Sequence, residues 1–175
     1  MIRQLRNKLI LAVVVLTVAA SAAWAQTPSS GLRAVDGSTV NRSAWQGKVV
    51  VLSFGGTWLP LAAKEQQALQ KLADRFAERG VQVYWVSINP NKPGARNYAS
   101  DQDLQAFAQK NGSRVGVLRD PEQNVYREFA LDAVPTVIIL DRQGKVVRKH
   151  VGFGTDQGEA YGEIVRELDR LLSQK

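Results

Sequence analysis

The apolar run at residues 49–54 and the turn and helix that follow it constrain the fold most. The run contains three consecutive valines and is apolar at both alternating sets of positions, which is typical of a strand buried on both faces of a sheet. Gly55-Gly56 interrupts the run, and Pro60 suits the first turn of a helix. Apolar residues then recur at three- and four-residue steps up to Gly80, at Leu61, Ala68, Leu69, Leu72, Ala73 and Phe76. A central strand that leads directly into an amphipathic helix predicts an α/β fold.

The rest of the chain alternates strand and helix patterns. Ser100 and Asp103 form a capping-box pattern, and Asp141 and Gly144 fit the first and last places of a type I turn. Further strands are predicted at residues 81–88, 115–118, 136–140 and 145–151, and further helices after about residues 100, 123 and 159. This order predicts a central mixed β-sheet flanked by helices on both faces.

Two shorter segments carry turn signals. Asp36-Gly37 lies within residues 32–40 and predicts an N-terminal β-hairpin extension of the sheet. Residues 89–99 contain two prolines, a glycine and three asparagines, which predicts a loop of roughly ten residues. Loops of this length are often functional.

The first 25 residues have the pattern of a secretory signal peptide. Three bases precede an apolar run that ends near Ala20, and Ala23-Trp24-Ala25 offers small residues at a cleavage site. The run is shorter than the about 20 apolar residues of a spanning helix. We therefore predict cleavage after Ala25, export to the periplasm and no stable membrane anchor, with an uncleaved anchor as the alternative. The mature chain would consist of a linker at 26–31 and one domain at 32–175.

The charge of the chain does not indicate a nucleic-acid partner. Removing Arg3, Arg6 and Lys8 with the signal peptide takes the formal net charge from +7 to +4. The remaining bases are spread along the chain without a basic run interleaved with aromatic residues. A solvated surface is the simpler interpretation.

The segment at 49–65 resembles the active-site segment of the TlpA/ResA branch of thioredoxin-like proteins. The pattern Phe54-x-x-Thr57-Trp58-x-Pro60-x-x-x-Lys64-Glu65 carries the resemblance, which continues in family order through residues 80–88, 120–129, 133–136 and 141–154. The resemblance implies a thioredoxin-like fold. It also implies that Val134-Pro135-Thr136 forms the family's loop with a cis proline facing the active site.

The catalytic cysteines of that family are absent. Leu59 and Ala62 occupy the two cysteine positions, and the chain contains no cysteine elsewhere. Disulfide exchange requires attack by a thiolate, which neither side chain can supply. Ser53 lies where relatives tend to place an acid that moves protons, so the loss of proton handling is expected as well. Peroxidase and copper-carrying functions of this fold need the same kind of cysteines and are excluded on the same ground.

Other catalytic or metal chemistry has weak support in the sequence. His150, the single histidine, lies in a predicted strand without a cluster of acids or thiols, so no metal site and no cofactor are expected. Ser53, Thr57 and Ser87 are conceivable nucleophiles, but a triad would have to recruit His150 from a distant strand. Ordinary hydrogen bonding is the simpler role for all three hydroxyls.

The remaining candidate site is a binding groove. It would be lined by Thr57, Trp58, Leu59, Pro60, Leu61, Val134, Pro135 and Thr136. In relatives the backbone of the residue before the cis proline pairs with an extended segment, and this pairing needs no thiol. The alternative is that the apolar side chains simply fill the old active site, and their exposure distinguishes the two interpretations.

The sequence therefore predicts a redox-inactive binding or scaffolding module for another periplasmic protein or an extended peptide segment. Two alternatives stay open. One is an enzyme that uses a thiol of its substrate, such as a glutathione-type molecule held near Thr57 at the helix N-terminus. The other is a redox subunit whose cysteines come from a partner chain.

Overall fold

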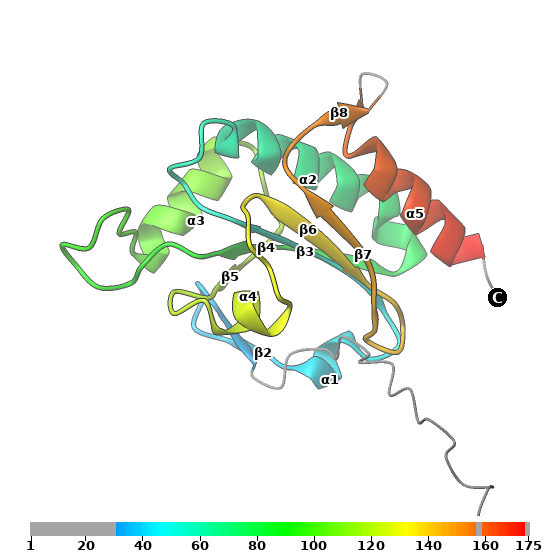
Figure 1. Cartoon of the computed structure of the whole chain (residues 1–175), viewed down its shortest axis with the longest axis horizontal. Coiled ribbons are helices and arrows are strands. Elements are labelled where there is room, and N and C mark those ends of the chain that lie inside the picture. Colours follow the sequence, from blue (N-terminus) through cyan, green and yellow to red (C-terminus); the bar gives the residue numbers. More distant parts are fainter. Residues whose placement is uncertain (1–30, 157–158, 174–175) are drawn as a thin grey trace, which may run out of the picture.

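The computed structural model describes residues 31–156 and 159–173, and its centre is a seven-stranded mixed sheet (Figure 1). The strand order is β2-β1-β5-β4-β3-β6-β7. The parallel core consists of β3 (Val49–Gly55), β4 (Val81–Ser87) and β5 (Gly116–Arg119). All seven residues of β3 are buried, as its apolar run predicts for a central strand.

Antiparallel strands extend the sheet on both sides. On one side, β6 (Thr136–Leu140) pairs with β3 and β7 (Val146–Val151) pairs with β6. On the other side, β1 (Leu32–Ala34) and β2 (Thr39–Val40) form the predicted N-terminal hairpin, and β1 pairs with β5. The mixed sheet and the hairpin extension are confirmed.

Helices cover both faces of this sheet (Figure 1). One hydrophobic core lies between the sheet and the helices α2 (Ala62–Phe76), α3 (Asp101–Lys110) and α5 (Gly162–Ser173). A second core on the opposite face includes side chains of α1 (Arg42–Trp45) and α4 (Asn124–Glu128). The 3-10 turn η1 (Ala77–Arg79) follows α2 and ends at Gly80, whose φ of +76° permits the reversal.

Local signals in the sequence position several element ends correctly. Ser100 and Asp103 form the reciprocal capping box at the start of α3. The Asp120 carboxylate accepts hydrogen bonds from the backbone N–H groups of Val125 and Tyr126, so it caps α4. The predicted turn between β6 and β7 closes with a hydrogen bond from Gly144 N to Asp141 O.

Three element boundaries differ from the predictions. Residues 42–45 form the short helix α1 where a simple turn was predicted. Helix α2 begins at Ala62 rather than at Pro60 because residues 56–61 are occupied by tight turns. Helix α5 begins at Gly162 instead of about residue 159, because β8 (Thr155–Asp156) and β9 (Glu159–Ala160) pair before it. Tyr161 then has φ +60°, which a right-handed helix cannot contain.

The predicted signal peptide at 1–25 and nearly all of the linker at 26–31 lie outside the described residues. Within the described part of the chain, no helix has the length and apolar character needed to cross a membrane.

Candidate functional site

The register of the sheet brings four connecting segments together at one of its ends. Gly55 pairs with Ser87, so the segments that follow β3 and β4 leave the sheet side by side. Phe54 pairs with Thr136 and Thr136 pairs with Val151, so the start of β6 and the end of β7 lie at the same end. The segments at 56–61, 88–99, 133–135 and 152–154 therefore surround one place on the surface.

The segment at 56–61, here called the remnant loop, holds two large apolar side chains in partial contact with water. Its turns are closed by hydrogen bonds from Leu59 N to Gly56 O and from Ala62 N to Leu59 O. The Trp58 side chain is 38% exposed and Leu61 is 43% exposed, whereas Leu59 is half-buried. Leu61, which the sequence places both in the apolar helical pattern and among the groove residues, lies outside the helix because α2 starts one residue after it.

Trp58 folds back over the backbone of its own loop. A β-carbon added to Gly56 would lie 2.1 Å from an atom of the Trp58 ring. Only glycine therefore leaves room for the indole in this position. The side chain is exposed, but its place is defined by the turn.

The segment before β6 has the geometry implied by the family resemblance. The Val134–Pro135 peptide bond is cis. Pro135 O accepts a hydrogen bond from Gly152 N at 2.7 Å, and the hydroxyl of Thr136 donates to Ala133 O at 2.7 Å. Thr136 is buried, so its side chain supports the turn from within. The backbone N–H and C=O of Val134 make no hydrogen bond to any other described residue.

Asn89, which the sequence did not single out, connects the remnant loop to the neighbouring loop. Its Oδ1 accepts from Thr57 N at 3.1 Å, while its Nδ2 donates to Thr57 Oγ1 at 2.9 Å and to Asn97 O at 2.8 Å. Ser87 Oγ also donates to Oδ1. Asn89 is completely buried, so its side chain is shielded from water, although its partners Thr57 and Asn97 are themselves in partial contact with water. The side chain fixes Thr57 and the loop at 90–99 in one arrangement.

Arg119 forms hydrogen bonds at both ends of the loop at 90–99. Its guanidinium donates to Ala99 O at 2.9 Å and to Asn89 O at 3.2 Å, and it forms an ion pair with Asp101 at 3.0 Å. The Arg119 side chain is nearly fully buried. The loop at 90–99 is thus held at both ends by buried polar side chains.

A buried carboxyl group lies directly behind the remnant loop. Glu65, in the first turn of α2, accepts a hydrogen bond from Ser53 Oγ at 2.5 Å, and the hydroxyl of Tyr161 lies 3.4 Å from the same oxygen. Burial raises the pKa of Glu65 from 4.5 to about 7, although the hydrogen bonds from Ser53 and Tyr161 oppose the shift. Gly55 makes room for the carboxyl, because a β-carbon there would lie 3.3 Å from Oε2.

Residues 11–149 match the AhpC/TSA family, which is most of the chain. The chain belongs to the AhpC/TSA family. It is 26% identical over 136 residues to the thiol-disulfide oxidoreductase ResA of Halalkalibacterium halodurans, covering 77% of this chain and 72% of the relative. It is also 26% identical over 129 residues to ResA of Bacillus subtilis, covering 74% and 67%.

Solved structures confirm the thioredoxin-like fold. A thioredoxin-like protein from Porphyromonas gingivalis superposes with a TM-score of 0.64 at 27% identity, over 86% of this chain and 94% of the other. The exposed lipoprotein thioredoxin of Streptococcus pneumoniae gives a TM-score of 0.63 at 24% identity, over 81% and 98%. The predicted family resemblance and fold are therefore correct.

This member of the AhpC/TSA family keeps a proton-binding group at the site although it has no cysteine. The prediction that proton handling is lost rested on Ser53, and the structure places Glu65 beside that serine from the adjacent helix. The signal was present in the sequence, because Glu65 lies three residues before Ala68 and four before Leu69, on the apolar stripe of the helix. A carboxyl in a buried stripe is unusual unless it is paired.

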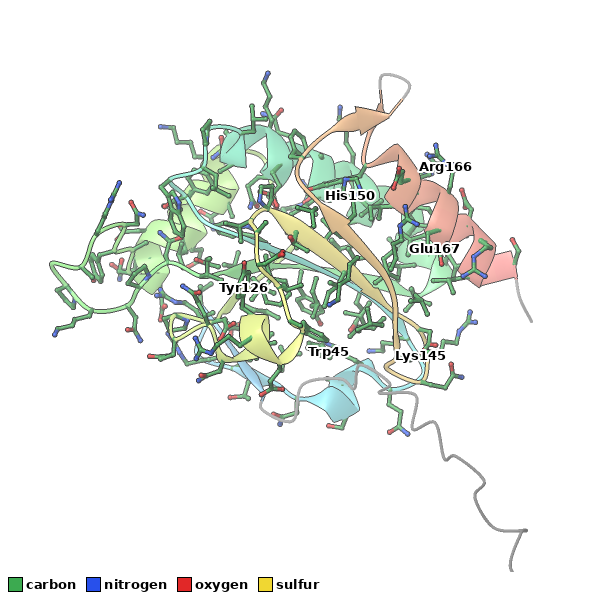
Figure 2. The ribbon with its side chains drawn as sticks, in the orientation of Figure 1. Trp45, Tyr126, Lys145, His150, Arg166 and Glu167 are labelled. Carbon is green, nitrogen blue, oxygen red and sulfur yellow. The ribbon has the colours of Figure 1, made fainter. Side chains whose placement is uncertain are left out.

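The candidate nucleophiles have structural roles in the AhpC/TSA chain. Ser53 donates to Glu65, Ser87 to Asn89, and Thr57 accepts from Asn89. His150 lies on β7 near α5, with Nδ1 3.5 Å from Glu163 of that helix (Figure 2). Among residues 31–156 and 159–173, no group of three potential ligands is placed to hold a metal ion.

Proposed function

We propose that this protein is an exported binding module that works without thiol chemistry, through the remnant loop and the adjoining Val134–Pro135 turn. The observation that supports the proposal is the exposure of Trp58 and Leu61 on a loop that hydrogen bonds to the buried Asn89 side chain hold in place. Large apolar side chains that only filled a former active site would be buried. Aromatic side chains in such positions are typical anchors at interfaces.

The partner would bind as an extended segment that pairs with Val134. The N–H and C=O of this residue are unpaired among the described residues and lie beside the cis proline. Backbone pairing of this kind supplies hydrogen bonds independently of sequence, while side-chain contacts supply specificity. Trp58, Leu59, Pro60 and Leu61 would provide the apolar contacts.

The proposed location is the periplasm. The basic start, the apolar run and Ala23-Trp24-Ala25 support export with cleavage after Ala25. Mass spectrometry of the protein isolated from its host is the test, and an intact Met1 in the membrane fraction would contradict the proposal.

A second candidate function is supported by Glu65. A carboxyl with a pKa of about 7 beneath the loop could exchange a proton with a thiol that a substrate or a partner brings to the site. This alternative includes a glutathione-type substrate and a redox partner that supplies both cysteines. It predicts turnover in an assay with glutathione or with a reduced partner, and loss of that turnover in Glu65→Gln.

Affinity capture distinguishes the two functions. The wild-type chain should retain a periplasmic protein from an extract treated with a thiol-blocking reagent, because binding through Trp58 and Val134 needs no thiol. Trp58→Ala should no longer retain this protein, and Trp58→Phe should retain a reduced amount of it. Retention that disappears after thiol blocking would contradict the proposal and favour a thiol-dependent role.

A further inference from the structure

The loop at 90–99, here called the basic loop, forms a second side of the proposed site. Asn89 Nδ2 donates to both Thr57 Oγ1 and Asn97 O, so the residues that follow, Trp58 and Tyr98, come from backbone segments held next to each other. Tyr98 is 38% exposed, as Trp58 is. The basic loop projects beyond the end of the sheet (Figure 1). Two partly exposed aromatic side chains therefore come from segments that the Asn89 side chain joins by hydrogen bonds.

Exposed positive charges lie around these aromatic residues. Lys92 and Arg96 are exposed on the basic loop, and Lys64 is exposed one helical turn after Leu61. Among the described residues, none of the three has a hydrogen-bonding or ion-pair partner on its side chain. Unpaired cations beside exposed aromatic rings are available to a ligand.

Two acids near the basic loop, Asp101 and Asp103, make hydrogen bonds within the chain, whereas a third, Glu122, is exposed and lines a hollow together with Asn91 of the loop. Asp101 binds Arg33 at 2.7 Å and Arg119 at 3.0 Å, and these guanidinium groups hold the pKa of its carboxyl below the usual value. The Asp103 carboxylate accepts from Ser100 in the capping box. An exposed carboxylate, that of Asp132, lies on the other side of the site, close to Val134 in the chain. The two exposed cations Lys92 and Arg96 lie on the basic loop itself, while the exposed acids lie beside it at Glu122 and on the Val134 side at Asp132.

We propose that this face selects an extended, acidic segment of a partner protein. The inference rests on the proposed function and names the chemistry of its partner. Backbone groups of the segment would pair with Val134, an apolar or aromatic side chain would pack on Trp58 and Tyr98, and carboxylates would lie against Lys92 and Arg96. Asp132 repels acids from the Val134 side, so the acidic residues lie toward the basic loop.

A peptide fits these observations better than a nucleic acid or a lipid surface. Three separated cations and the exposed acids would give a polyanion a weak and interrupted field. The unpaired backbone of Val134, in contrast, matches an extended peptide in particular. Binding to anionic vesicles is therefore an outcome of the test.

Selection from a random peptide library tests the inference. The purified chain is immobilised, and displayed twelve-residue peptides are selected against wild type, Trp58→Ala, and the charge-reversed pair Lys92→Glu with Arg96→Glu. Lys71→Glu with Lys110→Glu is the matched control, because both lysines are exposed on helices away from the face and the change in net charge is the same. Selected peptides are then measured by titration, together with vesicles containing phosphatidylglycerol.

The expected result is a set of peptides with acidic residues beside an apolar or aromatic residue. Charge reversal at residues 92 and 96 should lower the affinity for these peptides by about tenfold at low salt. The effect should shrink as salt is added. The control pair should bind as wild type does. Peptides that depend on Trp58 but show no acidic bias would overturn the inference and leave the proposed function standing.

Two other outcomes would contradict the proposed function as well. If the selected peptides bind Trp58→Ala and wild type with equal affinity, both the proposed function and this inference are contradicted. Binding to the vesicles without any peptide selection would overturn both and assign the basic loop to a lipid surface.

Discussion

The remnant loop and the helix turn behind it reverse the usual distribution of side chains. In the loop, Trp58 and Leu61 expose large apolar groups to water; behind it, Glu65 keeps a carboxyl group out of water. Either feature alone lowers the stability of the folded chain, because apolar exposure forgoes burial and carboxyl burial forgoes hydration. Their coexistence at one end of the sheet indicates that this region is shaped by something other than stability.

The comparison separates two kinds of residue at the site. Exposed residues of the loop should affect binding more than folding. Buried polar residues should affect folding, and should act on binding only through the position of the loop. Four predictions test this division.

The largest effect is expected for Glu65→Gln. The pKa of Glu65 is about 7 in the folded chain and 4.5 in its ordinary state, so the unfolded chain loses this proton at lower pH. Wild-type stability should therefore fall as pH rises from about 4.5 to 7 and then level off, by about 3 kcal/mol in total. Glu65→Gln should remove this fall and be more stable than wild type at pH 8.

Urea unfolding at several pH values measures this prediction. Glu78→Gln is the control, because it makes the same chemical change at an exposed position of the chain. If the unfolding free energy of Glu65→Gln changes with pH as much as that of wild type, another titratable group causes the pH dependence.

Trp58→Ala should weaken partner binding by about 2 kcal/mol or more, as for an interface hot spot. Its unfolding free energy should change much less than that of Trp85→Ala. Trp85 is fully buried, and truncation of a core tryptophan costs about 3 to 5 kcal/mol. Titration with a captured partner and thermal melting of both variants check the contrast. Equal destabilisation by the two changes would assign Trp58 to the core.

Asn89→Ala should destabilise the chain by about 1 to 2 kcal/mol, because Thr57 N–H and Asn97 O lose their buried partner. Amide exchange at Thr57 should accelerate, since its N–H is then free. Asn91→Ala, in the exposed part of the basic loop, is the matched control and should change neither quantity. Unchanged exchange at Thr57 in Asn89→Ala would mean that the loop is fixed by other contacts.

The smallest effect on the fold is expected for the pair Leu59→Cys with Ala62→Cys. Ala62 N donates to Leu59 O at 3.1 Å, so the two positions are joined by a tight turn. The pair should oxidise to a local disulfide, seen by mass spectrometry as the loss of two hydrogens that a reductant reverses. Leu59→Cys alone should show no such loss within one chain. A pair that stays reduced in oxidising buffer would count against the loop geometry.

The sequence predicted the features of the fold that depend on local pattern. The continuous apolar run at 49–54 correctly indicated a fully buried strand, and Ser100 and Asp103 marked the start of α3. The cis bond at Val134–Pro135 followed from the family resemblance and not from the residues alone. These features need little knowledge of what lies across the fold.

The features that were missed depend on contacts between distant elements. Asn89 reads as one of three asparagines in a loop, and its role appears only when Thr57 is placed beside it by the pairing of β3 with β4. The sequence indicates that Glu65 lies on the apolar stripe of α2, but its partners Ser53 and Tyr161 come from distant elements and appear only in the structure. The late start of α5 depends on Tyr161. Its side chain is buried, and its backbone has a φ of +60°, which is incompatible with the helix.

The hydrogen bonds made by the buried Asn89 side chain affect the kinetics of binding. Because this side chain already joins Thr57 to Asn97, the two loops need no rearrangement before a partner arrives. Association should then follow a single exponential phase whose rate rises linearly with partner concentration, with a rate constant of about 10⁵ to 10⁷ M⁻¹s⁻¹. Nearly all of the conformational ordering on binding would then occur in the extended segment of the partner. Differences in affinity between partners should appear mainly in the dissociation rate constant.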